Sequence, residues 1–285
     1  MIKSRSCNVR IGFFMEKQKY MISQINPRLL EYFIKSVRKD KIYSRAAIIE
    51  KLKQKDLLNA RDPILLGELI DILVDFKLLE LKEKDFILTE LGQKLKSIFL
   101  RDPGLFYEIY HLLNYYNFDI NNEKLEFLPF KSYQLLCNWI SDHKQNPNTK
   151  QLADEIDNEI KQNYNVIGSF SEVCIRRGIS WLKMLSPPVF DDYKEYVNRK
   201  PINIESVLLN LSYYYQVRTM RYGDPLFLNS LAIKEISRAS LMDSTITEDL
   251  LKELADRFPN VLKFKYNISG SIVVLNKQIE ISDII

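Results

Sequence analysis

The chain has 285 residues, 46% of them hydrophobic and 27% charged, which is enough apolar material for a core and excludes wholesale disorder. Its 8 glycines and 10 prolines are few, which favours helices over a turn-rich β-sandwich, and no stretch is apolar for long enough to form a membrane helix. The net charge of +4 is unevenly distributed, because residues 1–55 carry +10 and the remainder −6, which indicates an anionic partner such as nucleic acid for the N-terminal end.

Residues 1–25 are interpreted as a flexible basic leader. Their apolar stretch, 11–15, is too short for a signal-peptide core, and no small-residue cleavage site follows it. Two roles are left open for the leader: a tail without function, or an arm that contacts nucleic acid. Three widely spaced cysteines and two histidines predict neither a disulfide framework nor a metal site, and they favour a reducing, cytoplasmic compartment.

A first domain is predicted over residues 26–101. Apolar residues recur there at helical spacing, and residues that favour helix starts precede each run. The predicted helices begin at Pro27, after Ser44 and at Asp62-Pro63, and the third ends at Lys77.

A β-hairpin is predicted directly after the third helix. Residues 78–81 and 86–88 have the composition of short strands, and a polar turn separates them. Thr89 is placed to cap a fourth helix. The stretch 73–92, with its Leu-Leu pair, charged turn, returning strand and Leu-Thr-x-x-Gly run, resembles winged-helix regulators of the MarR and ArsR kind. This resemblance implies a winged-helix fold for the first domain and carries little information about function.

The middle region, 102–201, is predicted to be a helical domain rich in aromatic residues. Its apolar stripes are more typical of a packed core than of a cofactor site. Helices are expected around 105–113, 133–140 and 152–160, and a further helix is expected to end before Pro187-Pro188.

Residues 202–285 are interpreted as a second, winged-helix-like domain. Two apolar helices are followed by Thr245 and Glu248, which have the spacing of a capping box in front of a third helix. Strands over 261–266 and 271–275 can form a hairpin. The predicted fold is therefore mainly α, with two winged-helix modules flanking a helical middle domain.

The third helix of the first domain is unusual for a helix that reads DNA. Its solvent-facing candidates include Glu68, Asp71 and Asp75, which would repel a polyanion in the major groove. The corresponding helix of the second domain is also mostly acidic. Insertion of either helix into the groove is therefore disfavoured.

A dense basic surface of the first domain remains as the candidate nucleic-acid contact. Lysine and arginine side chains can hold phosphates without reading bases, with salt-sensitive affinity. The candidates in the helices and their connections are Lys35, Arg38, Lys39, Lys41, Arg45, Lys51 and Lys53, and those in the wing are Lys82 and Lys84. The second wing carries Lys263 and Lys265.

A second candidate cluster mixes tyrosine and arginine, a combination that suits base stacking or a protein interface. Its members are Tyr214, Arg218, Arg221 and Tyr222. An ordinary helix end with paired charges explains the same pattern, and we favour that interpretation.

No enzyme site is predicted, because the sequence has no glycine-rich phosphate loop and no Gly-x-Ser-x-Gly motif. No catalytic residue, cofactor or metal is expected. Asp224, Lys234 and Glu235 loosely match a nuclease triad, but they fall where helix is predicted.

The function expected is that of a non-enzymatic DNA-binding protein, either a regulator or a DNA-facing subunit. The first alternative is a protein-interaction subunit or scaffold, in which a protein partner or a second copy docks on the chain, and a nuclease is the third. The segment 180–188, together with the two flanking modules, resembles uncharacterised proteins encoded beside bacterial DNA-modification and phage-defence genes. No functional residue is transferred from that resemblance.

Overall fold

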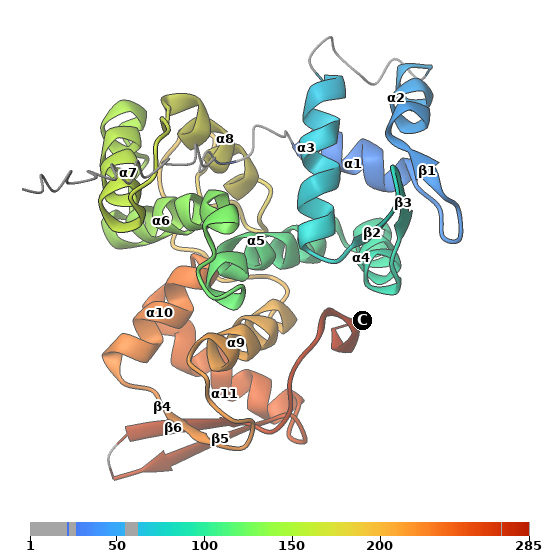
Figure 1. Cartoon of the computed structure of the whole chain (residues 1–285). Helices are drawn as coiled ribbons and strands as arrows, with labels where there is room; N and C mark the ends of the chain where they lie inside the picture. Colours follow the sequence, from blue (N-terminus) through green and yellow to red (C-terminus); the bar gives the residue numbers. More distant parts are fainter. Residues whose placement is uncertain (1–21, 23–26, 55–61, 269, 285) are drawn as a thin grey trace, which may run out of the picture.

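The computed structural model of the chain describes residues 22, 27–54, 62–268 and 270–284. The described part is mainly helical, as predicted, with two small antiparallel sheets (Figure 1). The leader predicted for residues 1–25 lies, apart from residue 22, outside the described residues. None of the described helices is both long enough and apolar enough to span a lipid bilayer.

The N-terminal module comprises four helices and a three-stranded sheet. The order of its elements is α1 Pro27–Ser36, β1 Tyr43–Ser44, α2 Arg45–Lys53, α3 Asp62–Asp75, β2 Leu79–Lys82, β3 Asp85–Leu88 and α4 Glu90–Arg101. The strands pair in the order β1-β3-β2, all antiparallel. The hairpin lies where the sequence predicts it, whereas the two-residue strand β1 was not predicted.

Local hydrogen bonds explain why the helices of this module begin where they do. The Ser44 hydroxyl accepts from the backbone N–H of Ala47 (3.1 Å), and the Thr89 hydroxyl accepts from that of Gly92 (3.0 Å). Both predicted caps are therefore confirmed. A Cβ on Gly92 would come within 2.1 Å of the Leu78 carbonyl oxygen, so only glycine allows α4 to approach the hairpin this closely.

The middle of the chain forms a layer of helices: α5 Pro103–Ile120, α6 Leu128–His143, α7 Thr149–Tyr164 and α8 Glu172–Leu182. The long helix α5 lies at the centre of the molecule and packs against α4, α6, α9 and α10 (Figure 1). Its apolar residues therefore belong to a hydrophobic core that also includes residues of the N-terminal and C-terminal modules.

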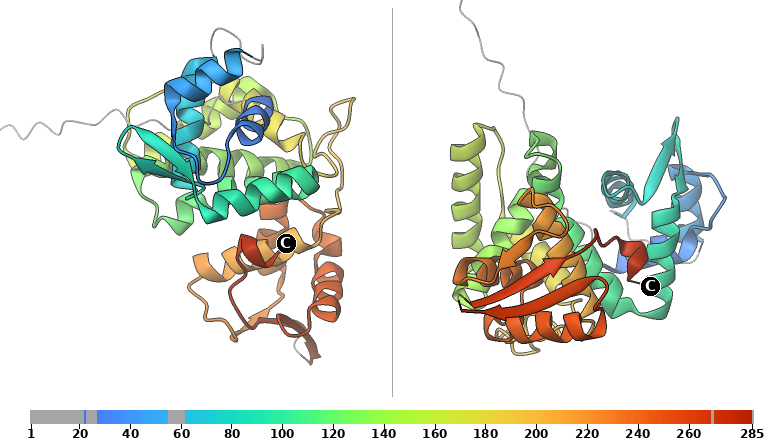
Figure 2. Two further views of the ribbon diagram at one scale, coloured as in Figure 1. Left: turned by 90° about the vertical axis from the view of Figure 1, so that its right-hand side faces the viewer. Right: turned by 90° about the horizontal axis from the view of Figure 1, so that it is seen from below.

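The C-terminal module comprises α9 Glu205–Val217, β4 Pro225–Phe227, α10 Ser230–Ser240, α11 Thr247–Arg257, β5 Leu262–Asn267 and β6 Gly270–Leu275. Its strands pair in the order β4-β6-β5. The order of helices and strands from α9 to β6 repeats that from α1 to β3, and in both cases the first strand pairs with the last. The two sheets lie apart, on different sides of the middle helices (Figures 1 and 2).

The capping box predicted from Thr245 and Glu248 does not form. A short 3-10 turn, Ser244–Ile246, precedes α11, and the carboxylate of Asp243 accepts from the Thr245 backbone N–H (3.0 Å). The Glu248 carboxylate instead accepts from the hydroxyl of Ser271 in the neighbouring strand β6. Tertiary packing therefore overrides the local motif here.

Candidate nucleic-acid interface

At the C-terminal end of α1, two backbone carbonyls accept hydrogen bonds from lysine side chains of neighbouring helices. The ammonium group of Lys51, from α2, donates to the carbonyl of Ser36, and that of Lys96, from α4, donates to the carbonyl of Val37. The last carbonyls of a helix lack partners within it and attract cations. Both lysines thus stabilise the helix end while adding positive charge to it.

Three further cations surround this helix end in the connection between α1 and β1. Arg38, Lys39 and Lys41 are exposed, and within the described part of the chain their side chains form no ion pair. The Lys41 ammonium lies 5.3 Å from the ring centre of Tyr43. Burial, reinforced by the charge of Arg38, lowers the pKa of Lys96, as expected where cations are crowded. We call Arg38, Lys39 and Lys41 the α1–β1 patch.

Several of the other side chains predicted to contact phosphates already form ion pairs within the protein. Lys35 pairs with Glu31 (3.4 Å), Arg45 pairs with Asp71, and Lys82 pairs with Glu80. Lys53 and Lys84 are exposed, at the end of α2 and in the turn between β2 and β3. The structure thus gathers the predicted cations on one module but neutralises three of them.

The negative charge of α3 is partly compensated, because the Arg45 guanidinium pairs with the exposed carboxylate of Asp71. Farther along the helix, burial together with the charges of Asp71 and Glu126 raises the pKa of Asp75 to about 6. A carboxyl whose pKa is raised on folding weakens the fold once the pH exceeds the pKa of the unfolded chain, about 3.8.

We therefore expect Asp75→Asn to stabilise the protein at pH 7. The side chain reaches solvent, so screening limits the gain to about 1 kcal/mol or less. The advantage of the asparagine variant should shrink as the pH falls from 7 to 4, because the native carboxyl becomes protonated. Urea unfolding of both proteins at several pH values measures this, and an advantage that grows toward pH 4 would contradict it.

The tyrosine and arginine cluster near the end of α9 is largely engaged within the molecule. Tyr214 is buried, and its hydroxyl donates to the carboxylate of Glu235 in α10 (3.0 Å). Arg218 pairs with the same carboxylate and lies over the Tyr214 ring. The Tyr222 ring stacks on that of Tyr215, whereas Arg221 is exposed.

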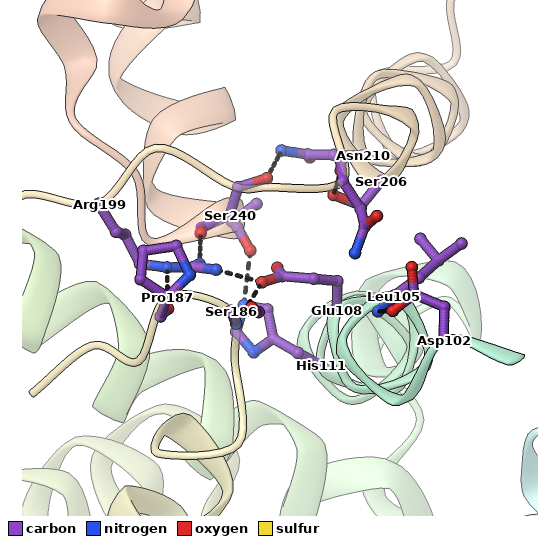
Figure 3. A network of polar contacts seen from close by, with 12 residues as sticks. Asp102, Leu105, Glu108, His111, Ser186, Pro187, Arg199, Ser206, Asn210 and Ser240 are labelled. Carbon is purple, nitrogen blue, oxygen red and sulfur yellow. Dashed lines mark hydrogen bonds and ion pairs between the residues drawn. The ribbon is translucent and has the colours of Figure 1, made fainter. Parts of the chain in front are cut away.

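A buried polar network lies elsewhere, in the interior between α5, the 183–204 segment and α10 (Figure 3). The Glu108 carboxylate and the Arg199 guanidinium form an ion pair in which neither side chain is more than 2% exposed. Arg199 also donates to the carbonyls of Pro187 (2.9 Å) and Ser240, and Glu108 accepts from the Ser186 backbone N–H (3.1 Å). The network therefore joins the middle helices to the C-terminal module.

His111 lies next to this ion pair, one helical turn beyond Glu108 on α5. Its Nε2 lies 2.8 Å from the Ala239 carbonyl oxygen, and its Nδ1 lies 2.9 Å from the Tyr133 hydroxyl. Because a carbonyl only accepts, Nε2 carries the proton and Nδ1 accepts from Tyr133. Burial, helped by the charge of Arg199, lowers the pKa of His111 to about 3.

Sequence reasoning missed Glu108, Arg199 and the contribution of Lys96. The one local signal was an acid at position 108 inside an otherwise apolar stretch of helix. In the described residues, no group of three or more His, Cys, Asp or Glu side chains is arranged to hold a metal ion.

No known family matches the chain, and no curated protein or solved structure shows significant similarity to it. The arrangement of its own residues therefore has to support any functional proposal.

Proposed function

We propose that the chain is a non-enzymatic DNA-binding protein that holds the phosphate backbone on the N-terminal module, either as a regulator or as the DNA-facing subunit of a complex. We further propose that both modules are winged helices. The repeated order of elements and the matching strand orders, β1-β3-β2 and β4-β6-β5, support this.

The observation that carries the proposal is the α1–β1 patch. Arg38, Lys39 and Lys41 crowd around a helix end that already holds the ammonium groups of Lys51 and Lys96. Exposed cations of this density attract a polyanion, which releases its condensed counterions when it binds. Contact through this patch also leaves the acidic helix α3 out of the major groove, so we expect little sequence preference.

The test is binding of a labelled random-sequence duplex to a variant with Arg38→Ala, Lys39→Ala and Lys41→Ala. We expect its affinity at about 50 mM salt to fall roughly ten-fold or more. The plot of log affinity against log salt concentration should become shallower by about 2 to 3, since each lost phosphate contact removes about 0.9.

A matched control removes three positive charges elsewhere, with Lys150→Ala, Lys183→Ala and Lys194→Ala, all exposed and far from α1 in sequence. The control should keep nearly all of the affinity if the patch, and not net charge, holds the duplex. Equal losses in the two triple variants would reject the patch as the contact site. No binding by the wild type at low salt would favour the protein-interaction alternative.

A further inference from the structure

A second charged surface lies in the C-terminal module, between α11 and strand β5. There the chain forms an open groove of about 330 Å³. From α11 and the residues after it, the groove is lined by Lys252, Ala255, Asp256 and Pro259, and from β5 it is lined by residues 262–266. Because β5 is an edge strand, one side of its backbone pairs with no other strand in the described part of the chain, and residues of this strand line the groove.

The charge of the groove favours an anionic occupant. Lys252, Lys263 and Lys265 are exposed, and none of them forms an ion pair with another described residue. Asp256 is the single acidic residue of the lining. Lys263 and Lys265 are two positions apart on a strand, so they project from the same face of β5 with Cα atoms about 6.8 Å apart, close to the step between successive phosphates of an extended nucleic-acid strand, whereas Phe264 and Tyr266 project from the opposite face.

The groove also carries aromatic surface that its own fold does not cover. The Tyr266 side chain is 64% exposed, and its ring lies edge-to-face against Phe264, with ring centres 5.0 Å apart. The Lys252 ammonium lies 5.7 Å from the Tyr266 ring centre. Exposed aromatic rings beside lysines provide base stacking together with phosphate contacts, the combination used to hold single strands.

We propose that single-stranded nucleic acid binds in this groove along the open edge of β5, with phosphates on Lys263 and Lys265 at one face of the strand and a base stacked on Tyr266 at the other. The inference rests on the proposed nucleic-acid binding and adds a second, separate contact surface to it. An acidic peptide pairing with the β5 edge is the competing occupant, but such a peptide has no need of an exposed tyrosine ring.

The test uses the full chain and a labelled oligothymidylate of about fifteen nucleotides, which does not form a duplex. Tyr266→Ala should weaken its binding about ten-fold, whereas Tyr266→Phe should keep the affinity, since stacking needs the ring and not the hydroxyl. Lys263→Ala with Lys265→Ala should weaken binding and make its salt dependence shallower by about 1.4.

A spectroscopic readout reports on stacking directly. In a Tyr266→Trp variant, oligothymidylate should quench the new indole fluorescence, while the tryptophan emission of the wild type, from Trp139 and Trp181, should change little because these rings pack within the helical layer. Unchanged affinity in Tyr266→Ala, or absence of quenching, would overturn the proposal. So would binding of a labelled polyglutamate peptide that Tyr266→Ala leaves intact while oligothymidylate fails to bind.

The two proposals fail in different ways. If only the groove is wrong, Tyr266→Ala binds oligothymidylate like the wild type, and the α1–β1 triple variant still loses duplex affinity. If only the patch is wrong, that triple variant keeps its duplex affinity, and Tyr266→Ala still loses oligothymidylate affinity.

Discussion

Replacing Glu108 by alanine is expected to lower the free energy of unfolding by about 3–5 kcal/mol, because the change leaves the Arg199 charge fully buried without its counter-ion. The Ser186 backbone N–H would lose its acceptor at the same time. Urea unfolding followed by circular dichroism measures the loss. Because this ion pair joins α5 to the segment that leads into the C-terminal module, we expect the packing of α5 against that segment to lose the most stability.

A double variant separates the charge effect from packing. Glu108→Met combined with Arg199→Met removes both charges at once, so we expect it to be more stable than Glu108→Ala alone. The matched surface control is Glu253→Ala, which breaks the exposed pair with Lys200 and should cost about 1 kcal/mol or less. A cost for Glu108→Ala as small as that of the surface control would show that the buried pair does not hold the fold together.

The second large effect expected is a loss of stability in acid caused by His111. Its pKa is about 3 in the folded chain and about 6.5 in the unfolded chain, so between these values only the unfolded chain takes up the proton. The stabilisation is complete above pH 6.5 and is lost as the pH falls toward 3. The loss from this one group is about 2 kcal/mol at pH 5 and about 4 kcal/mol at pH 3.

The measurement compares the free energy of unfolding of the wild type and His111→Gln at pH 7 and pH 5. Glutamine lacks the titrating group, so the wild type should lose about 2 kcal/mol more than the variant over this interval. Parallel losses in wild type and His111→Gln would mean that His111 is not held neutral.

The starts of α2 and α4 and both hairpins could be read from the sequence, because each is decided within a few residues. Ser44 and Thr89 satisfy backbone N–H groups three positions away, and an apolar run followed by a polar turn specifies each hairpin. The strands β1 and β4 could not be predicted, because two or three residues show no alternation and form a strand only by pairing with a distant partner.

The composition of the candidate interface could be predicted, but not which of its charges are free. The sequence shows that Arg38, Lys39, Lys41 and Arg45 belong to one basic region. Only the fold places Asp71 beside Arg45 and leaves the other three without an acidic partner among the residues that the structure describes. Lys263 and Lys265 could likewise be identified in the sequence, but the groove beside them could not, because it forms only where α11 packs against β5.

The sequence by itself determined the helical class, the order of most elements and the basic character of the N-terminal module, since these depend on periodicity, capping and composition. The tertiary structure alone decided that Glu108 and Arg199, 91 positions apart, pair in the interior, and that His111 is neutral. The physical reason is desolvation. Its cost depends on the surroundings that the whole fold builds around a charge, and no local pattern contains that information.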